Sequence, residues 1–334
     1  MRLWHMAVVA AAGLFAASCC DGGGGAAVSA PSGLYPAPQG DKWGFIDREG
    51  KPALEPRYDA VGAFSDGFAA VQVGGRRGKW GFIDTSGKVA VQTAYDAVLP
   101  FSEGFAAVKK ENLWGYVGRD GKEAFKPHFD DAQSFSEGLA AVHVGGRGGK
   151  WGYIDRSGKI VITPQFEEAD AFSGGLACVM VNRKWGYINK RGETAISPNF
   201  DGAMPFAEGL GLVRVGRSWG YVDGTGSTVI IPQYDDAGGF RDGLARVKSG
   251  KTWGFINKSG ATVIDAKYDD VQGFSEGLAA VRVGTKWGFI DRQGQFVINP
   301  QYDAAGPFTG GLSFVVDQKT QRYVDKKGQS VWPK

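Results

Sequence analysis

Short segments in which apolar and polar residues alternate recur along almost the whole chain, and a polar turn follows each one. Within residues 277–310, the segments 277–283, 287–291 and 296–299 have the alternation of half-buried β-strands. Residues 284–286 and 292–294 between them are short enough for hairpin loops. The pattern therefore predicts a three-stranded antiparallel unit. It predicts no helix in the connecting segment 300–311, whose apolar positions lack a 3.6-residue spacing.

Turn and linker residues predict where the strands of this unit end. Asp291 begins the second hairpin and is expected to cap backbone N–H groups, while Gly294 supplies the positive φ that closes a three-residue loop. Pro300 is expected to end the third strand, because proline has no N–H to donate to a neighbouring strand. Phe308, in the linker to the next unit, is expected to fold onto the core. These residue types recur in the other copies.

The unit repeats at a fixed distance along the sequence. The dipeptide Trp-Gly marks its copies, at Trp43, Trp80, Trp114, Trp151, Trp185, Trp219, Trp253 and Trp287. Neighbouring copies lie 34 residues apart, or 37 in two cases. A constant period of this size is typical of an array of supersecondary units. It places residues 33–334 in one elongated all-β domain of eight Trp-Gly units and a degenerate C-terminal copy.

The tryptophans are expected to be buried. Alternation along residues 287–291 places Trp287 and Phe289 on one face, and Gly288 and Ile290 on the other. Burying one tryptophan contributes up to about 5 kcal/mol, which favours a core ladder over a row of exposed rings that grip sugars. The glycine leaves a slot that a side chain or backbone of the next unit is expected to enter.

The two ends of the repeat favour an open array over a closed ring. The chain begins with a strand at Leu34, where Pro36 and Pro38 are compatible only with an unpaired edge. At the other end, Gln321 and Arg322 stand in the places of Trp and Gly. Polar terminal units suit an open array, and no blade divided between the termini is visible. We therefore expect an open β-solenoid or superhelix, with a β-propeller-like ring as the alternative.

Residues 1–32 have a different composition. An apolar stretch at 7–17 follows Arg2 and is too short to span a bilayer, as in a signal peptide. Small residues precede Cys19 as in a bacterial lipobox, which predicts a signal peptide at 1–18 and a lipid on Cys19. Cys20, or ordinary cleavage near Ser18, is the alternative. Residues 19–32 would form a tether. We expect an exported, membrane-anchored lipoprotein facing the periplasm or the cell surface.

The frame around each Trp-Gly carries a family resemblance. It reads Lys-Trp-Gly-Phe-Ile-Asp at 286–291, with Pro-x-Tyr-Asp at 300–303 and Phe-x-Glu-Gly-Leu-Ala at 274–279. In these motifs, residues 33–332 resemble the bacterial WG-repeat family. The resemblance implies an envelope or secreted protein with a binding or scaffolding role, and it brings no catalytic motif. Val117 and Gly118 depart from the frame in the third copy.

Little in the sequence suggests catalysis. A net charge of +3 points to no class of partner, and an exported chain is not expected to bind nucleic acid. His128 and His143 stand in different repeats, without the spacing of a metal site. The carboxylates of the linkers lack a calcium-loop pattern. Cys178 replaces a small core residue and is expected to be buried and inert. We therefore predict no metal, no cofactor and no enzymatic activity.

Charge is more informative at the level of the repeat. The first hairpin of each unit is basic and the linkers are acidic, so stacked units are expected to form one positive and one negative edge. Two of the hairpins, 74–79 and 145–150, are three residues longer than the others. Insertions on one face of a repeat array often mark its binding side. The candidate binding edge comprises Arg76, Arg77, Lys79, Arg147 and Lys150.

These observations favour a monomeric binding or scaffold protein whose partner is an unidentified envelope protein or an anionic polymer. Ordinary solubility charge on exposed turns is the alternative explanation for the basic hairpins. A structural envelope spacer is the main alternative function. An enzyme, or a carbohydrate binder that uses exposed aromatic rings, is the least favoured.

Overall fold

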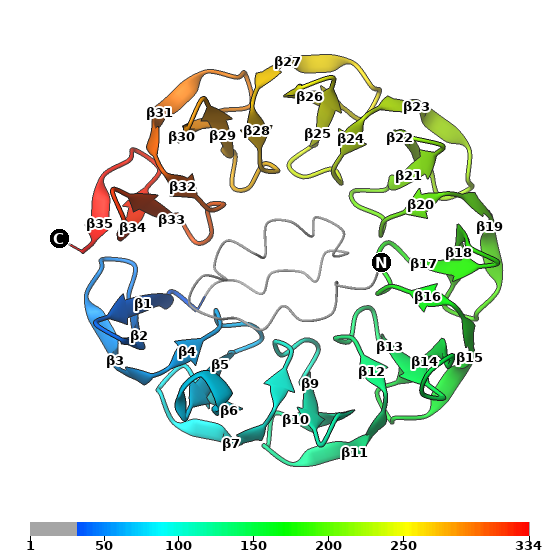
Figure 1. Cartoon of the computed structure of the whole chain (residues 1–334), viewed down its shortest axis with the longest axis horizontal. Helices are drawn as coiled ribbons and strands as arrows, with labels where there is room; N and C mark the ends of the chain where they lie inside the picture. The colour runs from blue at the N-terminus through cyan, green and yellow to red at the C-terminus, as the bar shows by residue number, and fades with distance from the viewer. Residues whose placement is uncertain (1–31, 334) are drawn as a thin grey trace.

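The structure, a computed structural model, describes residues 32–333. These residues form nine antiparallel sheets, which stand as blades around a central axis (Figure 1). The first sheet has three strands and each of the other eight has four. The described part of the chain is therefore a nine-bladed β-propeller.

Within a four-stranded blade, the strands lie side by side in the order of the sequence, and the long fourth strand lies at the periphery of the ring (Figure 1). The short first strands are β4 Ala60–Val61, β8 Ala97–Val98, β12 Asp131–Ala132, β16 Glu168–Ala169, β20 Gly202–Ala203, β24 Asp236–Ala237, β28 Asp270–Val271 and β32 Ala304–Ala305. The second strands are β1 Tyr35–Gln39, β5 Phe68–Val73, β9 Phe105–Lys110, β13 Leu139–Val144, β17 Leu176–Val181, β21 Gly211–Val215, β25 Leu244–Ser249, β29 Ala279–Val283 and β33 Leu312–Asp317.

The third and fourth strands complete each blade. The third strands are β2 Lys42–Ile46, β6 Lys79–Asp84, β10 Leu113–Gly118, β14 Lys150–Asp155, β18 Lys184–Asn189, β22 Ser218–Val222, β26 Thr252–Asn257, β30 Lys286–Ile290 and β34 Thr320–Asp325. The fourth strands are β3 Pro52–Tyr58, β7 Val89–Tyr95, β11 Glu123–Phe129, β15 Ile160–Phe166, β19 Thr194–Phe200, β23 Thr228–Tyr234, β27 Thr262–Tyr268, β31 Phe296–Tyr302 and β35 Ser330–Trp332. A 3₁₀ turn, η2, occupies Gly75–Arg77.

The hairpin between the third and fourth strands has the predicted chemistry. In the eighth blade, the Asp291 carboxylate accepts hydrogen bonds from the backbone N–H groups of Gln293 and Gln295, both at 2.9 Å. Gly294 has a φ of 79° and donates its N–H to the Asp291 carbonyl at 3.0 Å. The Asp and Gly of the recurring motif therefore close this loop by local hydrogen bonds.

The fourth strand corrects the prediction for Pro300. Strand β31 continues through this proline to Tyr302, because its register with β30 shifts: Trp287 lies opposite Tyr302, and Phe289 opposite Ile298. The extra residues form a bulge in an edge strand, where a proline without an N–H is tolerated. A Cβ on Gly288 would lie 2.5 Å from the Ile298 carbonyl oxygen. The glycine slot is therefore filled by the bulged backbone of the same blade, and not by the next unit.

The core lies between blades. One cluster joins Trp253 and Phe255 of the seventh blade with Phe274 and Ile290 of the eighth. Trp and Phe of the third strand thus face the next blade, while Ile faces the preceding one, as the alternation predicts. The linker phenylalanine packs edge-on against the third-strand ring, with centroids 4.8 Å apart for Phe255 and Phe274. Equivalent clusters fill the other junctions, so each blade buries both of its faces.

The ring is closed by the same kinds of contact that join internal blades. Tyr323 of the ninth blade packs edge-on against Tyr35 of the first, with ring centroids 5.5 Å apart, and donates a hydrogen bond to the Pro36 carbonyl at 3.0 Å. Internal tyrosines such as Tyr153 also donate a hydrogen bond across the junction, but to a carbonyl of the linker in the next blade, here Asp170 at 2.8 Å. The expected open solenoid is therefore wrong and the ring is correct. The terminal units are apolar where they meet, so they cover one another.

The first blade explains how closure occurs without a shared blade. Among residues 32–333 it has no short first strand, so within this range β1 pairs only with β2 and is an edge strand. Pro36 and Pro38 lie on β1, as their missing N–H groups require. All strands of the first blade come from one end of the described chain, and all strands of the ninth from the other. Among the described residues, no strand is exchanged between the two blades (Figure 1). Side-chain packing and hydrogen bonds such as that from Tyr323 to Pro36 join them.

Candidate interaction sites on the two faces of the ring

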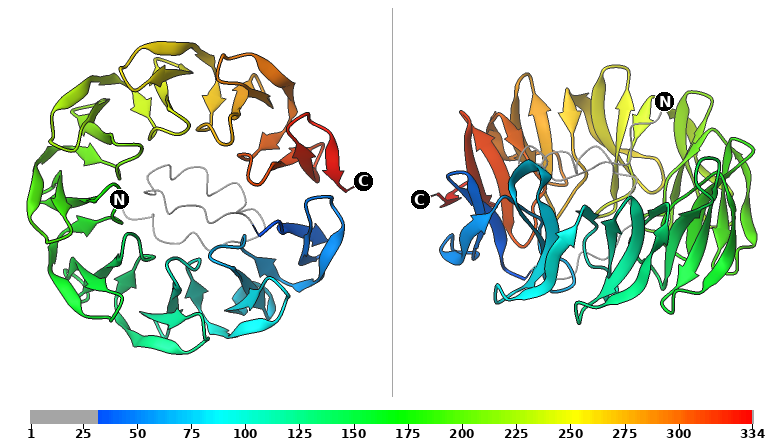
Figure 2. Two further views of the ribbon diagram at one scale, coloured as in Figure 1. Left: turned by 180° about the vertical axis from the view of Figure 1, so that it is seen from behind. Right: turned by 60° about the horizontal axis from the view of Figure 1, so that its bottom comes forward.

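The two kinds of hairpin lie on opposite faces of the ring. The hairpins that join second to third strands form one face, which we call the tip face. The hairpins that join third to fourth strands lie at the opposite ends of the third strands, and we call this the turn face (Figure 2). The linker turns that precede the second strands, such as Ser65 to Phe68, also lie on the turn face, since Asp66 contacts Arg119 of such a hairpin.

Carboxylates on the tip face neutralise many of its lysines. Asp59 accepts a bond from Lys42 of its own blade at 2.5 Å, and its other oxygen accepts the N–H groups of Gly74 and Gly75 at the tip of the next blade, both at 2.8 Å. Further lysine–aspartate pairs of this kind are Lys79–Asp96, Lys184–Asp201 and Lys286–Asp303. Each such aspartate therefore ties one blade to the tip of its neighbour.

This arrangement corrects the expected charge layout. The acidic linker residues do not form one negative edge. The carboxylate after each of the first eight fourth strands, such as Asp59, lies among the basic tips, while the acidic residue further along the linker, such as Asp66, lies on the turn face. A linker has two carboxylate positions, and the chain between them crosses from one face to the other. The structure therefore mixes both signs of charge on each face.

The two longer hairpins differ from the other tips. Arg76 and Arg77 are exposed within η2, and Arg147 is exposed at the tip of the fourth blade. Between residues 32 and 333, none of the three makes an ion pair within 4.0 Å. Of the other members of the candidate binding edge, Lys79 is paired with Asp96, and Lys150 is half-buried. The three arginines are thus the exposed members of this edge without an ion pair, and the half-buried Lys150 also makes none within the described residues.

Burial of the tryptophans is not uniform. Five of them are buried, at Trp43, Trp80, Trp114, Trp151 and Trp253. Trp185, Trp219 and Trp287 are half-buried and pack at the margin of their clusters, so the prediction of eight core rings overstates their burial. Trp185 and Trp219 line a shallow hollow of about 630 Å³ on the tip face. The Arg214 guanidinium carbon lies 5.7 Å from the centroid of the Trp219 ring, so a cation already covers part of one face of that ring.

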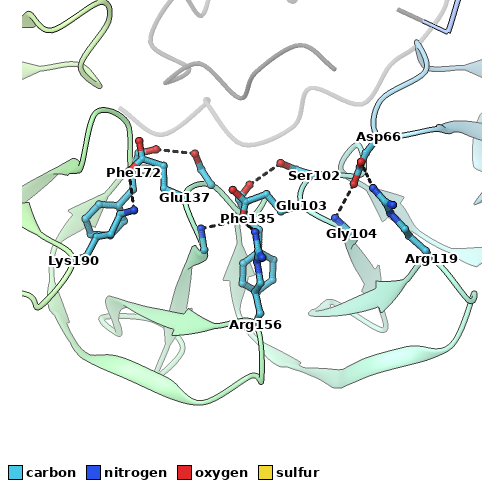
Figure 3. A network of polar contacts seen from close by, with 12 residues as sticks. Asp66, Ser102, Glu103, Gly104, Arg119, Phe135, Glu137, Arg156, Phe172 and Lys190 are labelled. Atoms are coloured by element: carbon cyan, nitrogen blue, oxygen red, sulfur yellow. Dashed lines mark hydrogen bonds and ion pairs between the residues drawn. The ribbon is translucent and has the colours of Figure 1, made fainter. Parts of the chain in front are cut away.

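A second set of carboxylates crosses the junctions on the turn face. Where the residue before the positive-φ glycine of a linker turn is Asp or Glu, it accepts the N–H of the equivalent glycine in the next blade. Asp66 accepts from Gly104 at 2.7 Å, and Glu103 from Gly138 at 2.9 Å (Figure 3). The same carboxylate pairs with a cation of the next blade, as Glu103 does with Arg156 at 2.7 Å. Glu137–Lys190, Glu208–Lys258 and Glu276–Lys326 are equivalent pairs.

Serines of the same turns are structural. Ser102 donates its hydroxyl to the Phe135 carbonyl of the next blade at 2.7 Å, and Ser136 donates to Phe172 at 2.7 Å (Figure 3). Neither the serines nor the carboxylates of the turn face were identified from the sequence as interblade contacts. The signal was the recurrence of Ser-Glu-Gly at the repeat period, which a purely local turn also explains.

These carboxylates predict a specific acid sensitivity. Partial burial raises the pKa of Glu103, but hydrogen bonds from Arg156 and the Gly138 amide outweigh it and hold this pKa below its ordinary value of 4.5. A carboxylate with a lowered pKa stabilises the fold above its unfolded-state pKa, and this stabilisation is lost as the pH falls through the folded-state value. Urea unfolding from neutral pH to about pH 3 should therefore show a smaller acid-induced loss for Glu103→Gln than for the parent. An equal acid-induced loss of stability in Glu103→Gln and the parent would contradict this prediction.

The candidate catalytic and metal residues are dispersed. His128 is exposed and lies over Phe129, while His143 packs against the Trp151 ring. Cys178 is fully buried, and burial raises the pKa of its thiol. Among residues 32–333, no group of three potential metal ligands is found. The predicted signal peptide, Cys19 and most of the predicted tether fall outside the described residues. No helix in the described range has the length and apolarity to cross a membrane.

Comparison with solved structures shows which known folds the chain resembles. The chain is similar to a crystal structure of a eukaryotic initiation factor, with a TM-score of 0.65 over 89% of this chain and 94% of that one, at 10% sequence identity. At this identity the likeness concerns the fold alone. A looser likeness, with a TM-score of 0.48, links it to the dihydro-heme d1 dehydrogenase NirN, at 13% identity over 90% of this chain and 74% of that one. No functionally curated protein matches the sequence.

The family model described as "WG containing repeat" matches the chain eight times. The matches cover residues 43–76, 80–114, 114–147, 151–185, 185–217, 219–253, 253–287 and 287–318. Each begins at the tryptophan of a third strand and ends near the tip of the following blade. Since these matches cover most of the chain, the protein belongs to the WG containing repeat family.

Proposed function

We propose that this protein is a non-catalytic interaction scaffold that binds an acidic protein of the cell envelope through the tip face, with Arg76, Arg77 and Arg147 as its main contacts. The observation that carries the proposal is the group of three exposed arginines on the two longer tips, which make no ion pair within residues 32–333. The shorter tips also expose Arg183 and Arg217 without an ion pair in the described chain. Lys42, Lys184 and Lys286 are held by aspartates of the same face, whereas the three arginines project without an ion pair in the described chain. Unpaired guanidinium groups favour carboxylate partners.

The spacing of the two longer tips supports a broad contact. They belong to the second and fourth blades, and the tip of the third blade lies between them with Lys109 and Lys110. A partner that engages both arginine groups must therefore span three blades. The tips are also well ordered by carboxylate capping, as Asp130 accepts the Gly146 N–H at 2.7 Å. Ordered tips lose little conformational freedom on binding, which favours affinity for a folded protein surface.

We place this scaffold at the envelope because of its first 32 residues. Their apolar stretch and the small residues before Cys19 support export and lipid attachment, and the Gly-rich segment after Cys19 supports a tether between membrane and ring. Mass spectrometry of the N-terminal peptide from the native membrane tests this directly. A diacylglyceryl-modified cysteine at position 19 supports the assignment, and an unmodified or uncleaved N-terminus would overturn it.

Charge reversal tests the role of the arginines. The triple variant Arg76→Glu, Arg77→Glu, Arg147→Glu is expected to reduce partner capture by about tenfold or more at low salt, because three attractive contacts become repulsive. Capture is measured by cross-linking in the native cell followed by mass spectrometry. The matched control is Lys51→Glu, Lys88→Glu, Lys159→Glu, which makes the same change in net charge with exposed residues of the turn-face hairpins.

The outcomes separate the proposal from its alternatives. Loss of one acidic protein with the arginine triple, and not with the control, supports it. Equal loss with both variants would show that only net charge matters. If the parent protein captures an anionic polymer and no acidic protein, the tip face binds a polymer instead of a protein. A uniform cross-linking pattern without saturation would favour a structural spacer.

A further inference from the structure

The turn face has a rule that holds at its junctions. Where a linker turn carries Asp or Glu, this carboxylate accepts a glycine N–H of the next blade, and most of these carboxylates also pair with a cation there. Two junctions lack the carboxylate, because Ser32 and Gly174 hold its position. At both, the cation position is also neutral, occupied by Thr85 and Gly224. At these two internal junctions, the carboxylate and its cationic partner are therefore both absent.

The seam between the ninth and first blades breaks this rule. Gly310 stands in the carboxylate position of the ninth blade, yet the cation position of the first blade holds Arg48. The guanidinium of Arg48 lies against the linker turn, since one of its nitrogens is 2.7 Å from the place of a Cβ on Gly311. Within residues 32–333 this arginine has no ion pair within 4.0 Å.

The amide that completes the arrangement is present. Gly33 has a φ of 73° and precedes Leu34, as Gly138 precedes Leu139 at an internal junction. It therefore holds the place whose N–H is bonded to a carboxylate elsewhere on this face. Among the described residues, no acceptor for the Gly33 N–H is found. The seam thus has the two hydrogen-bond donors of an internal junction, the Arg48 guanidinium and the Gly33 N–H, without the carboxylate that accepts from them elsewhere.

A pocket surrounds these two donors. It has a volume of about 500 Å³ and is lined by Gly33, Tyr35, Arg48, Glu276, Gly310, Gly311, Asp325, Lys326 and Lys327. Glu276 pairs with Lys326 at 3.3 Å, and Asp325, which has no ion pair among the described residues, accepts the backbone N–H of Lys327 at 2.9 Å. Outside the Glu276–Lys326 pair, the lining therefore carries the positive charges of Arg48 and Lys327 and the negative charge of Asp325, and this net positive charge favours an anion.

We propose that this seam pocket binds an aspartate or glutamate side chain of a partner protein, held by the Arg48 guanidinium and the Gly33 N–H. The internal junctions show the geometry, because Glu103 receives an arginine and a glycine N–H at 2.7 and 2.9 Å in the equivalent place. At the Asp66 junction the two donors meet different oxygens of one carboxylate, the Arg119 guanidinium at Oδ1 and the Gly104 N–H at Oδ2, which favours a planar carboxylate over tetrahedral anions. The pocket lies on the turn face and is distinct from the arginines of the tip face.

Nuclear magnetic resonance tests binding at a named atom. The probe is the capped tripeptide acetyl-Gly-Glu-Gly-amide, titrated into the full-length protein while the amide resonance of Gly33 is followed. A saturable shift of this resonance is expected, with no shift of the Gly104 amide, whose carboxylate position is already filled by Asp66. The same peptide with Gln in place of Glu should have no effect. If the Gly33 amide resonance does not shift with the Glu peptide, or shifts equally with inorganic phosphate, the proposal is overturned.

Two variants keep the test decisive. Gly310→Glu introduces the missing carboxylate at a φ of 62°, close to the 54° at which Glu103 sits in its turn. It should move the Gly33 resonance to its bound position and abolish the response to the peptide. Arg48→Gln should weaken peptide binding by about tenfold. Gly174→Glu is the matched control, because its junction lacks the cation, and it should leave the seam response unchanged. An unaltered peptide response in Gly310→Glu would refute the site.

Discussion

Replacing Gly288 with alanine is expected to lower the free energy of unfolding by about 3 kcal/mol. A Cβ at this position would stand 2.5 Å from the Ile298 carbonyl oxygen and 2.6 Å from the Pro300 nitrogen. Both atoms belong to the bulged backbone of β31, which cannot retreat without breaking its pairing with β30. The substitution therefore forces the fourth strand away from the blade. Equilibrium unfolding in urea measures the loss.

Gly224→Ala is the control for this prediction. Gly224 has no atom within 4 Å of its Cβ position and does not adopt a positive φ, so alanine should be neutral or slightly stabilising there. If Gly288→Ala unfolds at the same urea concentration as Gly224→Ala, the close approach of the bulge is not a constraint on the Trp-Gly motif. The comparison separates a steric effect from the general effect of removing a glycine.

Tyr323→Ala is expected to open the ring and to destabilise the protein by about 4 kcal/mol. Tyr323 is almost fully buried at the seam, where its ring packs on Tyr35 and on Phe314, with centroids 5.5 and 5.2 Å away. Its hydroxyl also donates to the Pro36 carbonyl. Removing the side chain leaves a cavity between the ninth and first blades, which are neighbours in the ring but do not follow one another in the sequence. Small-angle X-ray scattering should then report a larger radius of gyration, together with a lower unfolding midpoint.

Tyr323→Phe provides the comparison. It keeps the ring contacts and removes one buried hydrogen bond, so the ring should stay closed at a cost of about 1 kcal/mol. If Tyr323→Ala keeps the scattering profile of Tyr323→Phe, the seam does not depend on this side chain. In an open array, the same substitution would loosen only the last unit, because each repeat depends on its neighbours alone. The size of the change thus distinguishes a ring from a stack.

The elements were largely predictable because their causes are local. Asp291 and Gly294 close a hairpin through contacts within five residues, and period-two alternation is enough to assign Phe289 to one face and Ile290 to the other. The third-strand and linker rings, such as Phe255 and Phe274, follow from hydrophobicity at a fixed period. Pro300 was the local exception. Its effect depends on the register of two strands, and the sequence of one strand does not contain that register.

The candidate sites were less predictable because they join distant residues. The sequence located Arg76, Arg77 and Arg147 as an insertion, but it assigned the acidic linkers to one edge. Only the fold shows that Asp59 and Asp66 belong to opposite faces. The unpaired state of Arg48 is also invisible in one repeat, since its missing partner would be at position 310 in another blade.

By itself, the sequence determined the repeat, three of the four antiparallel strands of a blade, the turn chemistry and the apolar faces that each unit must bury, because these follow from propensities and periods within about 34 residues. The short first strand of each four-stranded blade, which lies in the predicted linker, was missed. The tertiary structure alone decided that the units close into a nine-bladed ring. Closure depends on a small rotation between blades that accumulates along the array, and no single repeat encodes its sum. It is secured by contacts such as the Tyr35 hydroxyl bond to the Gly310 carbonyl, 275 residues away in sequence. That closure also creates the seam pocket.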